Sequence, residues 1–212
     1  TRLQGDWSSD VCSSDLQKQQ RHTMIIDAAE ALLRQSGFDA MTMQAVARAA
    51  GLAKGTSYLY FASREALVLA VCDRLFDRWI DDFAAILPEW DNQEQLCRDF
   101  AACYARDPLF IQLVGFSTAL LEPQLGVADF IAAKRAIARR VKRLTGIVCA
   151  RLTIGVVAGQ RLVWRLLTVA GGTAQMTVKP PYEASDLPED VQAFADLADF
   201  QTVFMNAMMP AK

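Results

Sequence analysis

The sequence predicts an all-α protein, and three features of its 212 residues lead to that prediction. Apolar residues recur at the three- and four-residue spacing of an amphipathic helix along most of the chain. Glycine, proline and short polar residues separate these segments at positions typical of helix ends. No segment shows the strict alternation of a half-buried strand. Together these features predict about nine helices.

The first three predicted helices are closely spaced. An apolar stripe of helical period runs from Gln17 to Gln35 and ends before Gly37, a residue typical of helix C-termini. Thr42 has the residue type and the position of an N-cap for a second helix, which Gly51 ends. A third short helix is expected from about residue 53 to residue 60.

The later helices are longer, and several have recognisable starts. Asp91 with Glu94 fits a capping box, and Asp107-Pro108 fits an N-cap followed by a first-turn proline. A loop is expected between Gly171 and Pro181. The expected spans are Ser63 to near Leu87, Asp91 to about Ala105, Asp107 to about Leu121, Val127 to about Thr145, the apolar stretch after Gly146 as far as Ala170, and Pro188 to about Met208.

Residues 1–16 stand apart from this pattern. They include the segment DWSSDVCSSDL, which has neither a helical nor a strand period and back-translates to a sequencing-library adapter. We interpret residues 1–16 as a tail that is not native to the protein; a natural disordered tail is the alternative. We place a first domain at residues 17–64 and a second at residues 65–212.

The charge is distributed unevenly between these domains. Residues 17–64 carry six basic and three acidic side chains, a formal charge of +3, whereas residues 65–212 carry −3. A basic first domain suits contact with nucleic acid, although the excess is small. No uninterrupted apolar run reaches the roughly 18 residues of a membrane span. Four of the five cysteines fall in apolar helical stretches without zinc-site spacing, which favours free thiols in the cytoplasm, with a thiol sensor as the alternative.

The residue types that catalysis requires are scarce. His22 is the single histidine, so a Ser-His-Asp triad or a histidine-rich metal site lacks its members. Neither the G-x-G-x-x-G pattern nor the Walker pattern of phosphate-binding loops is present. We therefore expect no enzyme, no bound metal and no cofactor.

The most informative segment is residues 42–61. Its two short helices would meet at a turn containing Gly51, where glycine tolerates a positive φ, and Ala47 is small where the backbones approach. Leu52 and Phe61 are spaced to face inward and hold this crossing. The outward residues of the third helix are then Lys54, Gly55, Thr56, Tyr58, Leu59 and Tyr60. They offer donors for phosphates and rings for thymine methyl groups, as a helix in the DNA major groove requires.

Residues 25–67 read IIDAAEALLRQSGFDAMTMQAVARAAGLAKGTSYLYFASREAL. The order is a helix ending in G-F, a T-led helix ending in A-G, then KGT-x-Y-x-x-F and S-R-E-x-L. This run of 43 residues resembles the tetracycline-repressor (TetR, AcrR-type) family of bacterial transcriptional regulators, and at these offsets it is highly specific. The resemblance implies a repressor that releases operator DNA when a small molecule binds. The alternative is a helical ligand-binding or interaction protein that does not bind DNA.

The resemblance also implies roles for individual residues. It places Thr42 and Met43, at the N-terminus of the second helix, against a phosphate, and Gln44 near a base edge. It places Arg64 on a phosphate and the following residues in the groove: Lys54, Gly55, Thr56, Tyr58, Leu59 and Tyr60. Ser57 departs from the family pattern, which usually has an aliphatic residue there. Either its hydroxyl bonds back to the preceding turn, or the packing is weakened.

Past Leu67 the resemblance concerns only the number and length of the helices. It implies a homodimer built from the last two long helices, here Ala150–Ala170 and Pro188–Met208, on a palindromic operator; burial of the apolar Ala150–Ala170 within one subunit is the alternative. It also implies an effector pocket among the middle helices, and effector binding would shift the long fourth helix. The candidate pocket residues are Trp79, Phe83, Phe100, Tyr104, Phe110, Leu113, Phe116 and Leu120. Ordinary core packing is the alternative for each, and the basic run Lys134–Arg143 either meets an anionic effector or is a solvated helix face.

Overall fold

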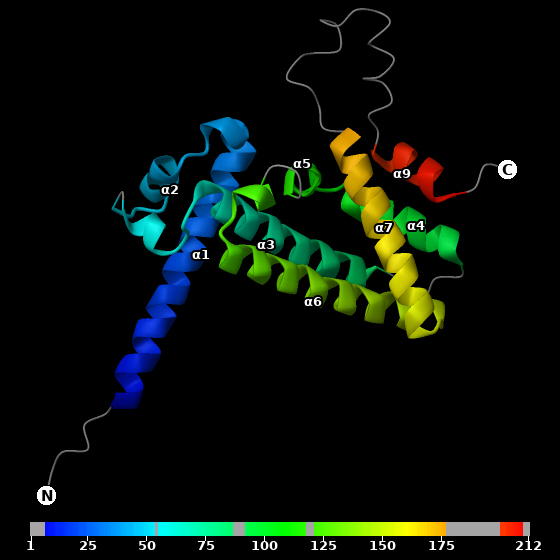
Figure 1. Cartoon of the computed structure of the whole chain (residues 1–212), viewed down its shortest axis with the longest axis horizontal. Helices are drawn as coiled ribbons and strands as arrows, with labels where there is room; N and C mark the ends of the chain where they lie inside the picture. The colour runs from blue at the N-terminus through cyan, green and yellow to red at the C-terminus, as the bar shows by residue number, and fades with distance from the viewer. Residues whose placement is uncertain (1–6, 54, 87–91, 118–120, 177–199, 210–212) are drawn as a thin grey trace, which may run out of the picture. The chain divides into compact units, whose positions relative to one another are not determined.

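The structure is a computed structural model that describes residues 7–53, 55–86, 92–117, 121–176 and 200–209. In these residues the regular secondary structure is entirely helical, with eight α-helices and two short 3₁₀ helices (Figure 1). The chain divides into two compact units, residues 1–71 and residues 72–212. The all-α fold predicted from the sequence is confirmed.

The first unit begins with the long helix α1, Trp7–Ala40. This helix includes residues 7–16, although their sequence shows no helical period. Once a helix is nucleated, each added residue gains a backbone hydrogen bond, so the helix can extend into a segment of low propensity. Gly37 interrupts α1 with a φ of 75°, which confirms the stop predicted there. The non-native origin of residues 1–16 stays a prediction.

The second helix, α2 (Met43–Ala49), has the predicted cap at each end. The Thr42 hydroxyl accepts a hydrogen bond from the Ala45 amide at 3.1 Å. At the other end Gly51 has a φ of 67°, and its amide donates to the Arg48 carbonyl at 3.1 Å. The Leu52 amide donates to the Ala47 carbonyl at 2.9 Å, which completes a Schellman motif.

The third predicted helix is shorter than expected. It is the 3₁₀ helix η1, Thr56–Leu59, so the prediction of a helix over about 53–60 is wrong in length. A segment this short gains few backbone hydrogen bonds, and its threonine and tyrosines are weak helix formers, so a single tight turn forms instead. The turn is closed by the amides of Tyr60 and Phe61, which donate to the Ser57 carbonyl at 3.2 and 3.0 Å.

We expect Gly51→Ala to destabilise the first unit by roughly 1–2 kcal/mol, because an L side chain is strained at a positive φ. Gly55→Ala is the matched control: its φ is −85°, and a Cβ atom at either glycine meets no atom within 4 Å. The measurement is urea unfolding followed by circular dichroism. Equal losses in the two variants would contradict the role given to the Gly51 backbone.

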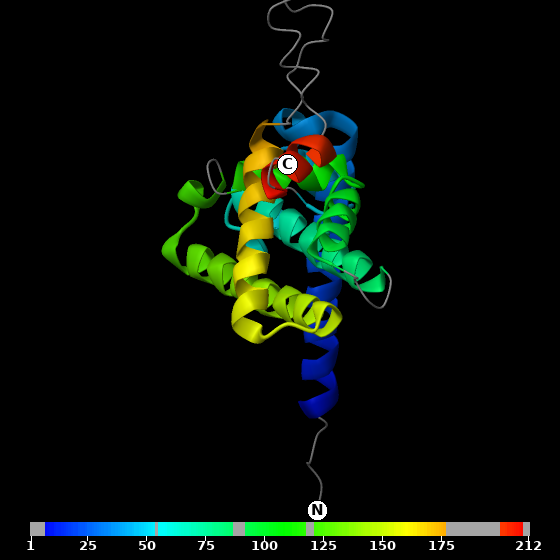
Figure 2. The same cartoon turned by 90° about the vertical axis from the view of Figure 1, so that its right-hand side faces the viewer.

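The second unit contains the C-terminal part of α3 (Arg64–Ala85) and the remaining helices. These are α4 (Gln93–Tyr104), α5 (Pro108–Phe116), η3 (Glu122–Gln124), α6 (Val127–Leu152), α7 (Val156–Met176) and α9 (Phe200–Met208). Helix α7 is central, since it contacts α5, α6 and α9, while α4 packs against α9. Helices α6 and α7 meet at a sharp turn of 117° (Figure 1, Figure 2).

Two predicted breaks in this unit are wrong. Helix α6 continues through Gly146 to Leu152, where Thr153 adopts a left-handed conformation with a φ of 51°. The predicted helix Ala150–Ala170 is therefore divided by the turn before Val156, and α7 continues through Gly171 to Met176. A glycine inside a helix costs only about 1 kcal/mol, which the burial of flanking side chains can offset.

The helix starts predicted in the second unit have a mixed outcome. Ser63 caps α3 by accepting from the Ala66 amide at 3.0 Å, and Asp107 caps α5 by accepting from the Leu109 amide at 3.1 Å, as predicted. The N-cap of α4 is Asn92, not Asp91: its side chain accepts from the Gln95 amide at 2.9 Å. The expected end of α3, near Leu87, and that of α5, near Leu121, fall at or beside residues 87–91 and 118–120, which lie outside the described residues. Asp91 and residues 188–199 of the predicted last helix lie outside the described residues.

No single helix in the described part of the chain is long and apolar enough to span a membrane; α6 and α7 meet that test only as a bent pair. Cys72, Cys97 and Cys103 are buried. Burial raises the pKa of Cys72 to about 12 and those of Cys97 and Cys103 to about 11. Such thiols stay protonated and unreactive at neutral pH, which disfavours a thiol sensor at these three positions.

Candidate functional site

The predicted DNA-contacting side chains of η1 lie on the surface of the first unit. Tyr58 is 56% exposed and Leu59 is 83% exposed. Gly55 is also exposed, while Thr56 and Tyr60 are half-buried. Large apolar side chains held in water on a capped turn are typical of a surface that a partner covers. Lys54, which was predicted for the same surface, lies outside the described residues.

The predicted contacts at the start of α2 differ in what they present. Thr42 and Gln44 are exposed, whereas the Met43 side chain is buried. Only the backbone amide of Met43 can therefore take part in a phosphate contact. Arg48 lies four residues after Gln44 on the same helix face and is exposed, so it is a further candidate that sequence reasoning missed. The four-residue spacing was the available signal.

The turn is braced from behind by buried side chains. Ala47, the small residue predicted where the helices approach, is buried; of the residues predicted to face inward, Phe61 is buried and Leu52 is half-buried. The Ser57 hydroxyl donates to the Met43 carbonyl at 3.5 Å, and not to the preceding turn. This long hydrogen bond connects η1 with the first residue of α2 and satisfies the hydroxyl in place of an aliphatic contact.

Arg64, the predicted phosphate contact at the start of α3, is held by two neighbours. Its Nε donates to the Glu65 carboxylate at 3.3 Å, and its guanidinium lies 4.3 Å from the centre of the Phe38 ring. This cation–π contact restricts the side chain before any phosphate binds. His22 is exposed, and its ring packs against that of Phe61 with the centroids 4.8 Å apart.

Six of the predicted effector-pocket residues are buried together in the second unit: Trp79, Phe83, Phe100, Tyr104, Phe110 and Leu113. The centroid of the Trp79 ring is 4.9 Å from that of Phe100 and 5.5 Å from that of Tyr104. Phe200 of α9, which sequence reasoning missed, stacks on Tyr104 at 4.9 Å. We call the following residues the aromatic cluster: Trp79, Phe83, Phe100, Tyr104, Phe110, Leu113 and Phe200. Phe116 is half-buried, and Leu120 lies outside the described residues.

One polar atom in the aromatic cluster, Trp79 Nε1, has no hydrogen-bond partner in the part of the chain that the structure describes. Trp79 is 4% exposed, and its Nε1–H has no hydrogen-bond acceptor among the described residues. A buried donor without an acceptor costs about 1–3 kcal/mol, so such groups usually face a water or a ligand. Burial also raises the pKa of Tyr104 well above its ordinary value, which keeps the phenol neutral. The surroundings of Trp79 therefore suit an uncharged, mainly apolar ligand that offers an acceptor.

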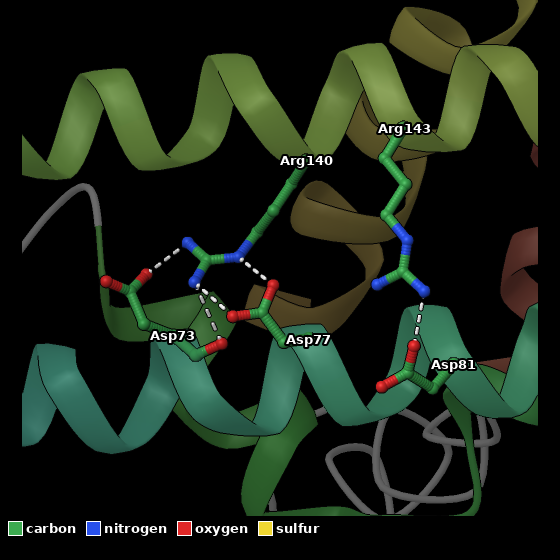
Figure 3. Close-up of polar contacts among 5 residues, drawn as sticks. All are labelled: Asp73, Asp77, Asp81, Arg140 and Arg143. Carbon is green, nitrogen blue, oxygen red and sulfur yellow. Dashed lines mark hydrogen bonds and ion pairs between the residues drawn. The ribbon is translucent and has the colours of Figure 1, made fainter.

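The basic run on α6 is partly neutralised by acidic residues of α3 (Figure 3). Arg140 is 8% exposed, and it binds the Asp77 carboxylate through Nε and Nη2, both at 2.8 Å. Its Nη1 donates to the Asp73 carboxylate at 2.6 Å. Arg143 pairs with Asp81 one turn further along. Burial raises the pKa of Asp73, although the adjacent Arg140 charge opposes that rise.

These contacts revise both interpretations of the run Lys134–Arg143. Lys134 pairs with the buried Glu122 at 2.7 Å, so three of the run's cations are bound to carboxylates of the protein. The run is therefore neither wholly solvated nor wholly available to an anion. No group of three or more histidine, cysteine or acidic side chains that could hold a metal ion occurs among the described residues.

The fold and this surface define a class: helix-turn-helix proteins with a larger helical second unit. A family model described as "Bacterial regulatory proteins, tetR family" matches residues 25–71. A second, described as "Tetracyclin repressor-like, C-terminal domain", matches residues 73–209. The chain belongs to the TetR family of bacterial regulatory proteins.

Curated relatives match over part of their length. The transcriptional repressor KstR of Rhodococcus jostii is 42% identical over 106 residues, which are 49% of this chain and 49% of that protein. The transcriptional regulator AlkX of Mycobacterium tuberculosis is 36% identical over 106 residues, 48% of this chain and 49% of that protein. The chain thus spans about half the length of the curated relatives it matches.

Solved structures match over most of their length. A TetR transcriptional regulator from Rhodococcus sp. RHA1 has a TM-score of 0.58 at 20% identity, covering 86% of this chain and 97% of that one. The multidrug binding protein EbrR, complexed with imidazole, has a TM-score of 0.51 at 20% identity, covering 91% and 97%. These likenesses show the fold.

Proposed function

We propose that the protein is a transcriptional repressor that binds a palindromic operator as a homodimer and releases it when a small molecule binds the second unit. The observation that supports this most directly is the exposed pair Tyr58 and Leu59, held on a short turn with Phe61 buried behind it. Membership of a family of regulatory proteins and the likeness to the repressor KstR support it further. The protein acts in the cytoplasm, where operator DNA is accessible.

In this proposal η1 enters the major groove and the start of α2 binds the backbone. Tyr58 and Leu59 contact base edges or thymine methyl groups, and Gln44 reaches an adenine. The remaining contacts go to phosphates and sugars, through Thr42, the Met43 amide, Lys54, Gly55, Thr56, Tyr60 and Arg64. Phosphate contacts fix the register of the protein on the duplex but carry no sequence information, so the specificity depends on Tyr58, Leu59 and Gln44.

The test is a mobility-shift assay with operator and random duplexes at several salt concentrations. A regulator should bind the operator by orders of magnitude more tightly than random duplex, with a steep loss of affinity as salt rises. The upstream region of the protein's own gene is the first operator candidate to screen. Absence of any salt-dependent shift with any duplex would favour the alternative, a helical ligand-binding protein that does not bind DNA.

The homodimer is proposed to form through α7 and α9, which correspond to the two last helices of the sequence prediction. Val157 is 66% exposed and Met176 is 80% exposed, although both are apolar and lie on the same helix. A short helix-turn-helix unit gains specificity only when a partner occupies the second half-site. Burying these side chains against a second copy would remove apolar surface from water, at about 25 cal/mol per Å².

We expect Val157→Asp to convert the dimer to a monomer, because each dimer would bury two uncompensated carboxylates. Size-exclusion chromatography with light scattering measures the mass, and circular dichroism checks the fold. Ile131→Asp is the matched control, since Ile131 is an exposed apolar residue of α6 that lies outside the proposed interface. A Val157→Asp protein that stays dimeric would remove α7 from the interface.

The effector is proposed to bind at the aromatic cluster, with an acceptor that satisfies Trp79 Nε1–H. Helix α3 connects the two functions, because the same helix begins with Arg64 and contributes Trp79 and Phe83 to the cluster. A ligand that prefers one arrangement of α3 shifts the population toward it. The resulting change in the spacing of the two η1 turns would end the fit to successive major grooves.

A further inference from the structure

A groove with a volume of about 490 Å³ lies between α6 and α7, and none of its lining residues belongs to the aromatic cluster. Helix α6 contributes Lys142 and Gly146, and α7 contributes Val156, Gln160 and Trp164. These residues recur every four positions, so one side of each helix forms one wall. The volume is within the range of about 300–1,000 Å³ that is typical of small-molecule sites.

The walls of the groove are mainly apolar and open to water. Trp164 is 50% exposed and Val156 is 69% exposed. A Cβ atom added at Gly146 would meet no protein atom within 4 Å, so the missing side chain leaves open space. Exposed apolar surface around an unfilled hollow gains free energy when an apolar ligand covers it.

The groove also contains Lys142, a cation with no acidic partner among the described residues. Lys142 forms no ion pair and no hydrogen bond with any residue in the described part of the chain. Its neighbours Arg140 and Arg143, in contrast, are each paired with aspartates of α3. The Lys142 ammonium group is thus available to an anion at the edge of an apolar hollow.

We propose that this groove is a second small-molecule site and binds an amphipathic organic anion. The apolar body of the ligand lies along Val156 and Trp164, and its acidic head group pairs with Lys142, with the Gln160 amide as a further polar contact. A second copy of the chain is a less suitable occupant, because lysine is depleted from the cores of protein interfaces. Val157 and Met176, the exposed α7 residues assigned to the proposed dimer contact, do not line this groove.

The experiment titrates the full chain with 8-anilinonaphthalene-1-sulfonate, an aromatic organic anion, and with N-phenyl-1-naphthylamine, its neutral counterpart. We expect saturable binding of both probes to the wild-type protein. Gly146→Leu fills the groove and should weaken both probes at least about tenfold. Ala132→Leu is the matched control, because Ala132 is an exposed small residue of α6 that does not line the groove and lies outside the proposed dimer interface.

Lys142→Gln removes the positive charge and keeps a side chain of similar length, so it tests the contribution of the charge alone. It should weaken the sulfonate about tenfold and leave the affinity for the neutral amine unchanged. Ala138→Leu, at another lining position on α6, replaces Gly146→Leu if that variant does not fold. Light scattering on each variant monitors the oligomeric state.

Three results would overturn the proposal. Unchanged probe binding in the groove-filling variants places the probes elsewhere. Equal effects of Lys142→Gln on both probes remove the role of the charge. A monomer produced by a groove-filling variant, with Ala132→Leu still dimeric, would show that a second copy of the chain occupies the groove. None of these results bears on DNA binding by η1, so failure here leaves the proposed repressor function intact.

Discussion

Tyr58→Ala is expected to reduce operator affinity by at least about 30-fold and to leave binding to random duplex almost unchanged. One base-edge contact is worth about 1–3 kcal/mol, and a homodimer on a palindrome makes that contact twice. Binding to random duplex depends on phosphate contacts from other side chains, so it should persist. The measurement is a pair of mobility-shift titrations, with operator and with random duplex, at one salt concentration.

The stability of the Tyr58→Ala protein should match that of the wild type. The Tyr58 side chain is 56% exposed, and substitutions at exposed positions usually change stability by less than about 0.5 kcal/mol. Ile131→Ala removes an exposed apolar side chain from the second unit and serves as the matched control, with no expected effect on DNA. Wild-type operator affinity in Tyr58→Ala would show that η1 is not the recognition element.

The features that sequence reasoning predicted well are those fixed by neighbouring residues. A cap needs only a short polar side chain at the right offset from the next amides, as at Thr42 and Asp107. A left-handed glycine after a helix is equally local, as at Gly51. These signals gave the boundaries of α2 and the start of α5 without any knowledge of the fold.

The errors occur where tertiary packing outweighs a local preference. Gly146 has the residue type of a helix end, but α6 continues through it, with Thr145 and Val148 buried on either side. The η1 segment has the pattern of a two-turn helix but forms a single turn. The contacts that favour a continuous α6 at Gly146 are absent from the local sequence, whereas the weak helix propensity of the threonine and tyrosines in η1 was a local signal that the helical pattern obscured.

The sequence predicted that the candidate effector residues are buried, but it could not show whether they form a ligand-binding site. An apolar stripe shows which side chains are buried, and core residues and pocket residues share that pattern. The unpartnered Trp79 Nε1–H became visible only when its surroundings were known. The ion pair between Arg140 and Asp77 was likewise not predictable from the sequence, because the two residues are 63 positions apart.

Arg140→Met is expected to reduce the free energy of unfolding of the second unit by about 1–3 kcal/mol. The substitution keeps the apolar stem but leaves Asp73 and Asp77 without the guanidinium that joins them (Figure 3). Removing one partner of a buried ion pair usually costs about 3–5 kcal/mol. We expect only about 1–3 kcal/mol here because both carboxylates are partly exposed to water. Arg143→Met is the matched control: Arg143 and Asp81 are both exposed, so about 0–1 kcal/mol is expected.

The pH dependence of this variant identifies the cause of the loss. Burial already raises the pKa of Asp73, and removal of the Arg140 charge should raise it further. The carboxyl group then binds a proton at a higher pH in the folded variant than in its unfolded chain, so lowering the pH stabilises the folded form at this position. The difference in Tm from the wild type should therefore narrow as the pH is lowered from neutrality toward the ordinary pKa of an aspartate, about 4.

A neutralised variant provides the decisive comparison for this ion-pair network. Adding Asp73→Asn and Asp77→Asn to Arg140→Met removes the uncompensated carboxylates, so much of the lost stability should return if charge is the cause. A loss that does not depend on pH and is not restored in the triple variant would assign the role of Arg140 to packing of its stem. Because Asp73 and Asp77 belong to α3, restored stability with an altered operator response would show that this network also sets the position of the helix shared with the DNA-binding unit.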